Sequence, residues 1–438
     1  MTVSVQKPLR LTYEAIITKE KLRGSLQAAL YLEFATIPPY LTAVYSMKDK
    51  SAEAYQIIRS VALEEMLHIN LVCNLLLAIG YTPLFVKPAS DPFNGLVNAP
   101  VPYISEITYP TYILPNFYEG PYVQILAASP ELIKQTFMAI EEPMQSNQPL
   151  PAQGEKFTSI GQIYQAIKEG FEYLDANIGS AALFSGTPEH QKTNYYFGSG
   201  GGKAIAVTNL ETAEQAIEQI VQQGEGATPP TTEYRPKQPY GTYNRYGHRN
   251  DGTYGPILGT PFELSHYFKF RDIADGKIPL PSAYPMLPNP SIAKFTGTPA
   301  EELASHFQDD YSLMIRALEQ AFADNTDTQA YFTTVVELMQ GVFPTVITQL
   351  MKTPISADTN STLGPTAGPC FEYTSITLQE ITAKVSNLKK KCLQSLLPKD
   401  KSSQDEVSRA MADTWHKLDE ALQKISKKIE GTPLEKHL

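Results

Sequence analysis

The stretch Ile58–Leu75 reads IRSVALEEMLHINLVCNL, and it decides the fold. Its apolar residues recur at helical spacing, and the pattern predicts a largely buried helix over residues 52–79. Glu65 and His68 stand on the inward stripe of this helix, three residues apart and therefore on one face. A carboxylate and an imidazole that enter a core together are costly to bury unless something compensates them, and a metal ion does so. The stretch therefore predicts a buried helix that carries a candidate metal site.

The preceding helix, predicted over residues 15–48, repeats this feature. Its inward positions include Leu26 and Leu30, and the next inward position is Glu33. Pro38 and Pro39 fall inside the same pattern, and we expect them to kink or interrupt the helix because proline lacks the backbone donor and clashes with the preceding turn.

A second Glu-x-x-His lies further along the chain. Glu263-Leu-Ser-His266 belongs to a predicted helix over about residues 261–275. Before it, a helix predicted over Leu210–Gln223 ends in Gln223-Gly-Glu225-Gly, with Glu225 in line with its apolar stripe. The order Glu, Glu-x-x-His, Glu, Glu-x-x-His is the set of ligands of a carboxylate-bridged two-metal site in a four-helix bundle.

Other residues compete for parts of this site. Glu169, on a helix predicted over Ser159–Leu174, and Glu142 are alternatives to Glu225 as the ligand from the third helix. Glu64 stands beside the ligand face, so we expect it to contact a ligand or to pair with a base. The competing interpretation, in which these groups are satisfied core pairs or exposed helix ends, would be preferred for a single Glu-x-x-His but is disfavoured for two.

Other side chains near the ligands, and the remaining histidines, carry weaker signals. Three tyrosines near the ligands in sequence could orient them or carry an oxidising equivalent, although core packing is the favoured interpretation: Tyr31, Tyr40 and Tyr267.

Among the remaining histidines, His248 is a weak candidate for a substrate loop. The other histidines are predicted to lie on the surface: His190, His306, His416 and His437.

Composition excludes several classes of function. The chain has 438 residues, 36 Lys and Arg against 46 Asp and Glu, and a net charge of −10, which argues against a nucleic-acid or anionic-membrane partner. Its three cysteines lie far apart, which excludes a thiolate zinc site and a disulfide framework. No signal peptide and no run of eighteen apolar residues occurs, so we expect a cytoplasmic protein without a membrane span.

The helical pattern predicts a mainly α fold. We expect a four-helix bundle over residues 15–280 with long irregular insertions at 82–205 and 226–260, a helical accessory region at 295–375 and a helical tail at 376–438. The amphipathic tail and the acidic balance allow a homodimer.

The segment Leu26–His68 resembles the ferritin-like domain of iminophenyl-pyruvate dimer synthases, enzymes of bisindole pigment biosynthesis. The resemblance rests on Tyr31-Leu-Glu33-Phe, the Pro-Pro-Tyr that follows, and Glu64-Glu65-Met-Leu-His68. It continues in Gln223-Gly-Glu225-Gly, Ser265–Phe270 and Gly368–Tyr373, and covers about residues 20–375. It implies a ferritin-like bundle with a non-haem iron site at six residues: Glu33, Glu65, His68, Glu225, Glu263 and His266.

Carboxylates with only two imidazoles favour iron or manganese over copper or zinc. We therefore expect two iron ions, with manganese as the alternative. The leading hypothesis is an oxidoreductase that uses dioxygen or peroxide on a small organic substrate, such as an aromatic amino-acid derivative. The alternatives are a ferroxidase or iron-binding protein without an organic substrate, and a scaffold that the metal stabilises.

Overall fold

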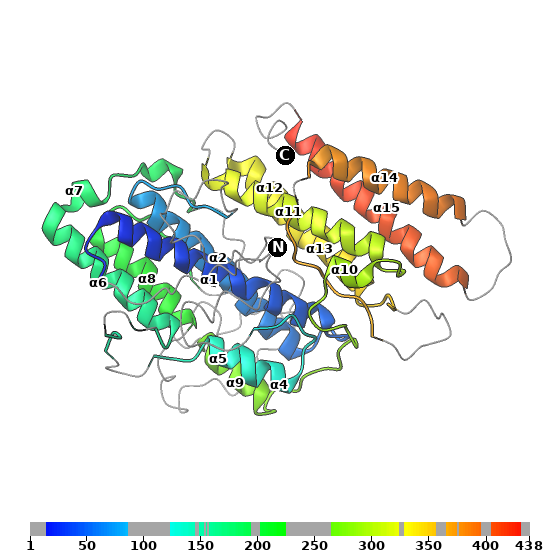
Figure 1. The fold of residues 1–438 in the computed structure, drawn as a ribbon, viewed down its shortest axis with the longest axis horizontal. Helices are drawn as coiled ribbons and strands as arrows, with labels where there is room; N and C mark the ends of the chain where they lie inside the picture. Colours follow the sequence, from blue (N-terminus) through cyan, green and yellow to red (C-terminus); the bar gives the residue numbers. More distant parts are fainter. Residues whose placement is uncertain are drawn as a thin grey trace, which may run out of the picture. The chain divides into compact units, whose positions relative to one another are not determined.

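The computed structural model confirms the mainly α fold class, and no strand occurs in the part of the chain that it describes. The described residues are 15–85, 123–144, 149–152, 155, 157–193, 202–224, 264–323, 328–355, 365–374, 376–395 and 404–430. Contacts divide the chain into two compact units, the first ending at Ala283 and the second beginning at Tyr284 (Figure 1).

The first unit is built on two long helices, α1 (Lys19–Ser46) and α2 (Glu53–Ala78), which pack along each other. The Thr18 side chain accepts a hydrogen bond from the Lys21 amide and caps the start of α1. The helix α1 continues through Pro38 and Pro39, so the interruption that the sequence allowed does not occur. Its side chains around the two prolines are buried, and this packing stabilises a helix that proline would break in isolation.

Shorter elements flank the two long helices. Near the start of α1 lie α6 (Ile160–Ile178), α7 (Ser180–Leu183) and the 3-10 turn η2 (Pro188–His190), followed by α8 (Leu210–Gly224). Near its end lie α9 (His266–Ala274) and a segment formed by α4 (Pro130–Leu132), the π-helical turn η1 (Ile133–Phe137) and α5 (Met138–Ile140). The rings of Tyr40, Phe137 and Phe270 join α1, η1 and α9, with centroids 4.6–5.3 Å apart.

Two further helix ends of the first unit have recognisable caps. Gly276, after α9, has a φ of 72° and its amide donates to the Ile273 carbonyl, as expected for a helix end. At the start of α8, the Asn209 side chain accepts a hydrogen bond from the Thr212 amide at 2.9 Å.

Among the described residues, α2 is the one long helix with a strongly apolar window of eighteen residues. By length and composition it could cross a membrane, but 89% of its most apolar window is buried inside the protein. A core helix passes the same test, and the packing of α2 against α1 accounts for its apolar character.

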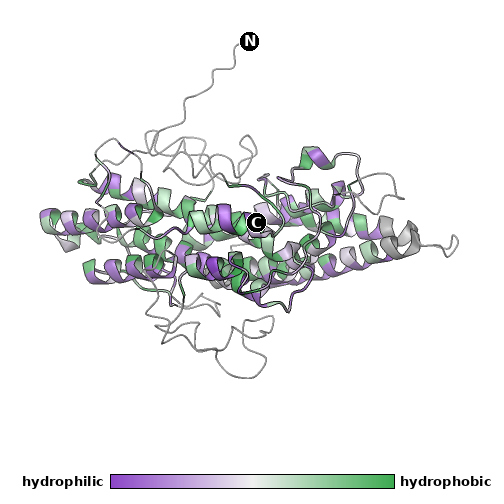
Figure 2. Ribbon diagram, turned by 90° about the horizontal axis from the view of Figure 1, so that it is seen from below, coloured by the Kyte–Doolittle hydropathy of each residue, from purple (hydrophilic) through white to green (hydrophobic). Residues whose placement is uncertain are grey.

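The second unit consists of helices with one apolar side. Figure 2 shows hydrophobic and hydrophilic residues alternating around the helices of the chain. The elements of the second unit are α10 (Ile292–Phe295), α11 (Glu301–Ala323), α12 (Thr328–Glu337), the π-helical turn η4 (Leu338–Val342), α13 (Phe343–Leu350), α14 (Leu378–Ser395) and α15 (Gln404–Ile429). The pair α14 and α15 forms the predicted tail helices and packs on α11, α12 and α13.

One histidine of the second unit that was predicted to lie on the surface is buried. His306 was predicted to lie on the surface, but it is fully buried, with Nε2 3.0 Å from an Asp310 carboxylate oxygen and its ring beside Trp415. The sequence reasoning sought a glutamate partner and overlooked an aspartate one helical turn later. His190 and His416 are exposed, and His248 and His437 lie outside the described residues.

Candidate metal centre

Two groups of buried carboxylate and imidazole side chains meet in the first unit and share one residue. Glu33, Glu65 and His68 form the first, which we call position 1, and Glu65, Glu141 and His266 form the second, position 2. Within each group the potential ligand atoms all lie within 4.8 Å of one another. None of the five side chains is more than 5% exposed. Each group could therefore hold a metal ion, with Glu65 between the two.

Local structure explains how these residues come together. The i, i+3 spacing on α2 places Glu65 and His68 on the face that packs against α1, where Glu33 lies. Glu141 directly follows α5, and His266 is the first residue of α9. The donors thus come from two long helices and from the ends of two short ones.

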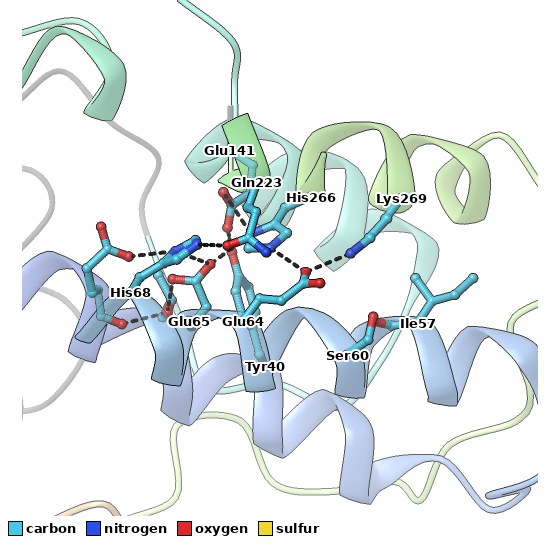
Figure 3. Close-up of polar contacts among 12 residues, drawn as sticks. Tyr40, Ile57, Ser60, Glu64, Glu65, His68, Glu141, Gln223, His266 and Lys269 are labelled. Carbon is cyan, nitrogen blue, oxygen red and sulfur yellow. Dashed lines mark hydrogen bonds and ion pairs between the residues drawn. The ribbon is translucent and has the colours of Figure 1, made fainter. Parts of the chain in front are cut away.

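The two positions have similar geometry. His68 Nδ1 lies 3.3 Å from a Glu33 oxygen and 3.7 Å from a Glu65 oxygen. His266 Nδ1 lies 2.8 Å from the same Glu65 oxygen and 3.5 Å from a Glu141 oxygen. The two imidazole rings are stacked with centroids 5.5 Å apart (Figure 3). Both histidines therefore direct Nδ1 toward carboxylates.

The other ring nitrogen of each histidine is occupied by an acceptor. His68 Nε2 lies 3.2 Å from the Gln223 amide oxygen, and His266 Nε2 lies 2.8 Å from a Glu64 carboxylate oxygen. Because these oxygens accept, Nε2 donates to them in both rings, and Nδ1 is the nitrogen that could bind a cation once it has released its proton. Such a contact fixes the ring orientation of histidines that bind metals.

The carboxylates are held by hydroxyl groups. Tyr164 on α6 donates to Glu33, and Tyr40 on α1 donates to Glu141 at 2.5 Å. The Thr36 hydroxyl lies 2.7 Å from the Glu33 carbonyl oxygen and 3.1 Å from a Glu65 carboxylate oxygen. The carboxylates of Glu33 and Glu141 are therefore oriented before any ion binds.

His266 provides a test of whether a metal ion fits. Its Nδ1 is fully buried and close to two carboxylates, yet it makes no hydrogen bond of acceptable geometry with any described residue. A proton on this atom would therefore not point at its neighbours, whereas a cation shared among the three donor atoms would satisfy all of them. The mixed oxygen and nitrogen donors, without thiolate, suit iron or manganese. The residues fit the metal pair that the sequence predicts.

The electrostatics of the site reflect an excess of buried negative charge. Burial raises the pKa of Glu33 to about 7. Burial alone would lower the pKa of His68, but Glu65 and Glu33 outweigh it and raise that pKa to about 10. The same competition raises the pKa of His266 well above its ordinary value, through Glu141, Glu64 and Glu65. At Glu65, burial alone would raise the pKa, but the two histidines outweigh it and lower that pKa. Cations are strongly favoured here, whether protons or metal ions.

A small cavity reaches position 1. It has room for about one water-sized molecule. Its lining includes Glu33, Glu65, His68 and Glu141 but not His266. The remaining lining is mostly apolar and comes from Leu32, Thr36, Ile160, Tyr164, Ile220, Val221 and Gly224. The cavity therefore borders all three donors of position 1 and two of the three donors of position 2.

Element ends converge on this cavity. The start of α6 and the end of α8 both line it, and Glu141 follows the end of α5. A Cβ atom at Gly224 would lie 3.3 Å from the Glu141 carboxylate, so the close approach of α8 to the site favours glycine there. The described residues stop at Gly224 and resume at Leu264, immediately before α9.

The structure brings four of the six predicted ligands together: Glu33, Glu65, His68 and His266. Glu225 and Glu263 lie outside the described residues, so their roles remain predictions. Both alternatives to Glu225 are exposed, and Glu169 bonds to Gln165 at the surface.

Glu141 was missed, although its neighbour Glu142 was considered. The spacing of Ile133, Phe137 and Glu141 in steps of four was the available signal, since Ile133 and Phe137 are fully buried. Sequence reasoning also missed the contacts of Tyr164 and Lys269, which lie far from their partners along the chain.

A comparison with protein families agrees with this fold. The ferritin-like family profile matches residues 26–275. A solved ferritin-like protein from Caulobacter vibrioides is 21% identical, with 73% of this chain and 93% of that chain aligned and a TM-score of 0.43. A comparison with curated protein sequences gives no match. Because the family profile matches more than half of the chain and the site has the buried Glu and His groups described above, the chain belongs to the ferritin-like family.

Proposed function

We propose that the protein holds two iron ions at positions 1 and 2 and acts as a non-haem oxidoreductase, with manganese as the alternative metal. The observation that carries the proposal is Glu65, whose carboxylate faces both His68 and His266. A carboxylate shared by two buried Glu and His groups is the arrangement that a bridged metal pair requires.

Bound iron would supply the electrons that reduce dioxygen or peroxide, chemistry that no side chain in the site can supply alone. The protein contributes orientation and exclusion of water. Tyr164, Tyr40 and Thr36 fix the carboxylates, and the deep burial of the ligands keeps bulk water away. The cavity beside position 1 has room for about one water-sized molecule, so only a very small reactant could enter it.

The substrate is proposed from the resemblance to iminophenyl-pyruvate dimer synthases. On that basis we propose a small organic compound, derived from an aromatic amino acid. The described cavity is too small for such a molecule, so the substrate would contact further parts of the chain.

Metal analysis of the purified chain tests the proposal. The wild type should contain two iron ions, and Glu65→Ala should lose both because each position loses a ligand. Glu142→Ala is the matched control, since Glu142 is exposed beside the site, and it should keep both ions. A wild type without bound metal, or a Glu65→Ala variant that keeps two ions, would contradict the proposal.

The size of the cavity favours one alternative, a ferroxidase whose substrate is ferrous iron itself. Oxygen uptake separates the two functions. A ferroxidase consumes dioxygen with ferrous iron alone over many equivalents per chain, whereas an oxidoreductase stops after the resident pair is oxidised and resumes with organic substrate and reductant. Metal content without oxygen uptake under either condition would indicate a structural metal.

A further inference from the structure

The cavity at the metal centre has two kinds of lining. Donor side chains of positions 1 and 2 form one part. The other part is mainly aliphatic and comes from three helices: Leu32 of α1, Ile160 of α6, and Ile220 and Val221 of α8. A molecule in the cavity therefore contacts both metal ligands and hydrocarbon.

The two hydroxyl groups in the lining are already engaged as donors. The Thr36 hydroxyl lies 2.7 Å from the Glu33 carbonyl oxygen, and the Tyr164 hydroxyl donates to the Glu33 carboxylate. Each hydroxyl has one hydrogen, and these contacts use it. A polar molecule that enters from water would exchange hydrogen bonds for hydrocarbon contacts, which is unfavourable.

Size and polarity together select the molecule that suits this lining. The cavity has room for about one water-sized molecule, which excludes the organic substrate proposed above. Of the two oxidants, hydrogen peroxide has two O–H groups that need acceptors, whereas dioxygen is apolar and gives up no strong hydrogen bond when it leaves water. The lining therefore favours dioxygen.

Val221 joins the cavity lining to the protein surface. Among the described residues that line the cavity, Val221 alone is partly exposed, while the others are buried. It lies in the last turn of α8, and its two methyl groups offer no hydrogen-bonding atom. A molecule that passes this side chain meets an apolar surface before it reaches the ligands.

We propose that the cavity is a binding site for dioxygen, and that Val221 is the residue that selects this oxidant over peroxide. The inference rests on the proposed function, in which both oxidants are open, and it names the one that the site takes.

Dioxygen itself is the probe for the metal-free, full-length protein. Because dioxygen is paramagnetic, it speeds the relaxation of nearby methyl groups in NMR spectra recorded under oxygen pressure. The enhancement at Ile220 and Val221 should be several-fold larger than at Ile58 and Leu71, which are completely buried on α2 outside the lining. An equal or smaller enhancement would overturn the inference.

A cavity-filling variant tests the role of Val221. Val221→Phe should abolish the excess enhancement at Ile220, because the larger ring occupies the space that dioxygen would take. Gln222→Phe is the matched control, since it adds the same ring at an exposed neighbouring position of α8, and it should keep the excess. Loss of the excess in both variants, or in neither, would contradict the role of Val221.

Stopped-flow oxidation of the iron-loaded protein tests the selection between oxidants. Val221→Thr keeps the shape of the side chain and adds a hydroxyl that can bond to peroxide. It should raise the ratio of the rate with hydrogen peroxide to the rate with dioxygen about tenfold, while the iron content stays at that of the wild type. An unchanged ratio would overturn the selection. Absence of iron binding in the wild type would overturn the proposed function, whereas the NMR measurement on the metal-free protein would still decide whether the cavity binds dioxygen.

Discussion

Iron binding at position 1 should become stronger as the pH rises, because the ion must displace protons from its ligands. The pKa of His68 is raised to about 10, so at pH 7 its Nδ1 is protonated when no metal is bound. Removing that proton at pH 7 costs about 4 kcal/mol, since the pKa lies about three units higher and one unit corresponds to 1.36 kcal/mol. The apparent affinity should therefore be about a thousandfold below its value at high pH.

The increase of iron affinity per pH unit should differ below and above about pH 7. Between pH 7 and 8 only His68 must release a proton, so the affinity should rise about tenfold per pH unit. Below pH 7 Glu33 is protonated as well, because burial raises its pKa to about 7. Two protons are then displaced, and the slope should approach a hundredfold per unit.

Anaerobic calorimetry with ferrous iron at pH 6, 7 and 8 measures this dependence. Repeating each titration in buffers of different ionisation enthalpy gives the number of protons released on binding. An affinity that is constant over this range, or binding that releases no protons, would refute the interpretation of the site as one in which metal ions replace protons.

Three further variants test individual contacts. Tyr164→Phe removes the hydroxyl that donates to Glu33, so iron binding at position 1 should lose about tenfold in affinity in the same titration while binding at position 2 stays the same. Asp310→Ala leaves a buried histidine without its partner and should lower the free energy of unfolding in urea by about 3–5 kcal/mol, followed by the fluorescence of Trp415; an unchanged midpoint would show that the pair contributes nothing. Gly186→Ala places a Cβ 1.7 Å from a backbone carbonyl oxygen of α2 and should cost about 1–3 kcal/mol of stability; a loss below 0.5 kcal/mol would mean that the loop can move away at little cost.

The sequence predicted the parts of the fold and site that depend on helical periodicity. Glu65 and His68 interrupt the apolar stripe of α2, and Glu33 interrupts that of α1, so all three could be assigned to an inward face. This works because the neighbours of these residues are buried over the whole length of both helices. His266 could be found because its motif repeats the one on α2.

Other features depend on tertiary contacts that no local pattern encodes. The contact between Lys269 and Glu64 joins residues 205 positions apart in sequence, so nothing near either residue indicates it. The sequence also could not show that α1 is uninterrupted at Pro38 and Pro39, because propensity reflects an isolated helix and not one packed against α2.

The location of the metal pair is tested most directly by anomalous diffraction from crystals of the iron-loaded protein. We expect two iron peaks, one bound by Glu33, Glu65 and His68 and the other by Glu65, Glu141 and His266, with the Glu65 carboxylate between them. A single peak, or iron bound away from Glu65, would contradict the account of a shared carboxylate at the centre of this site.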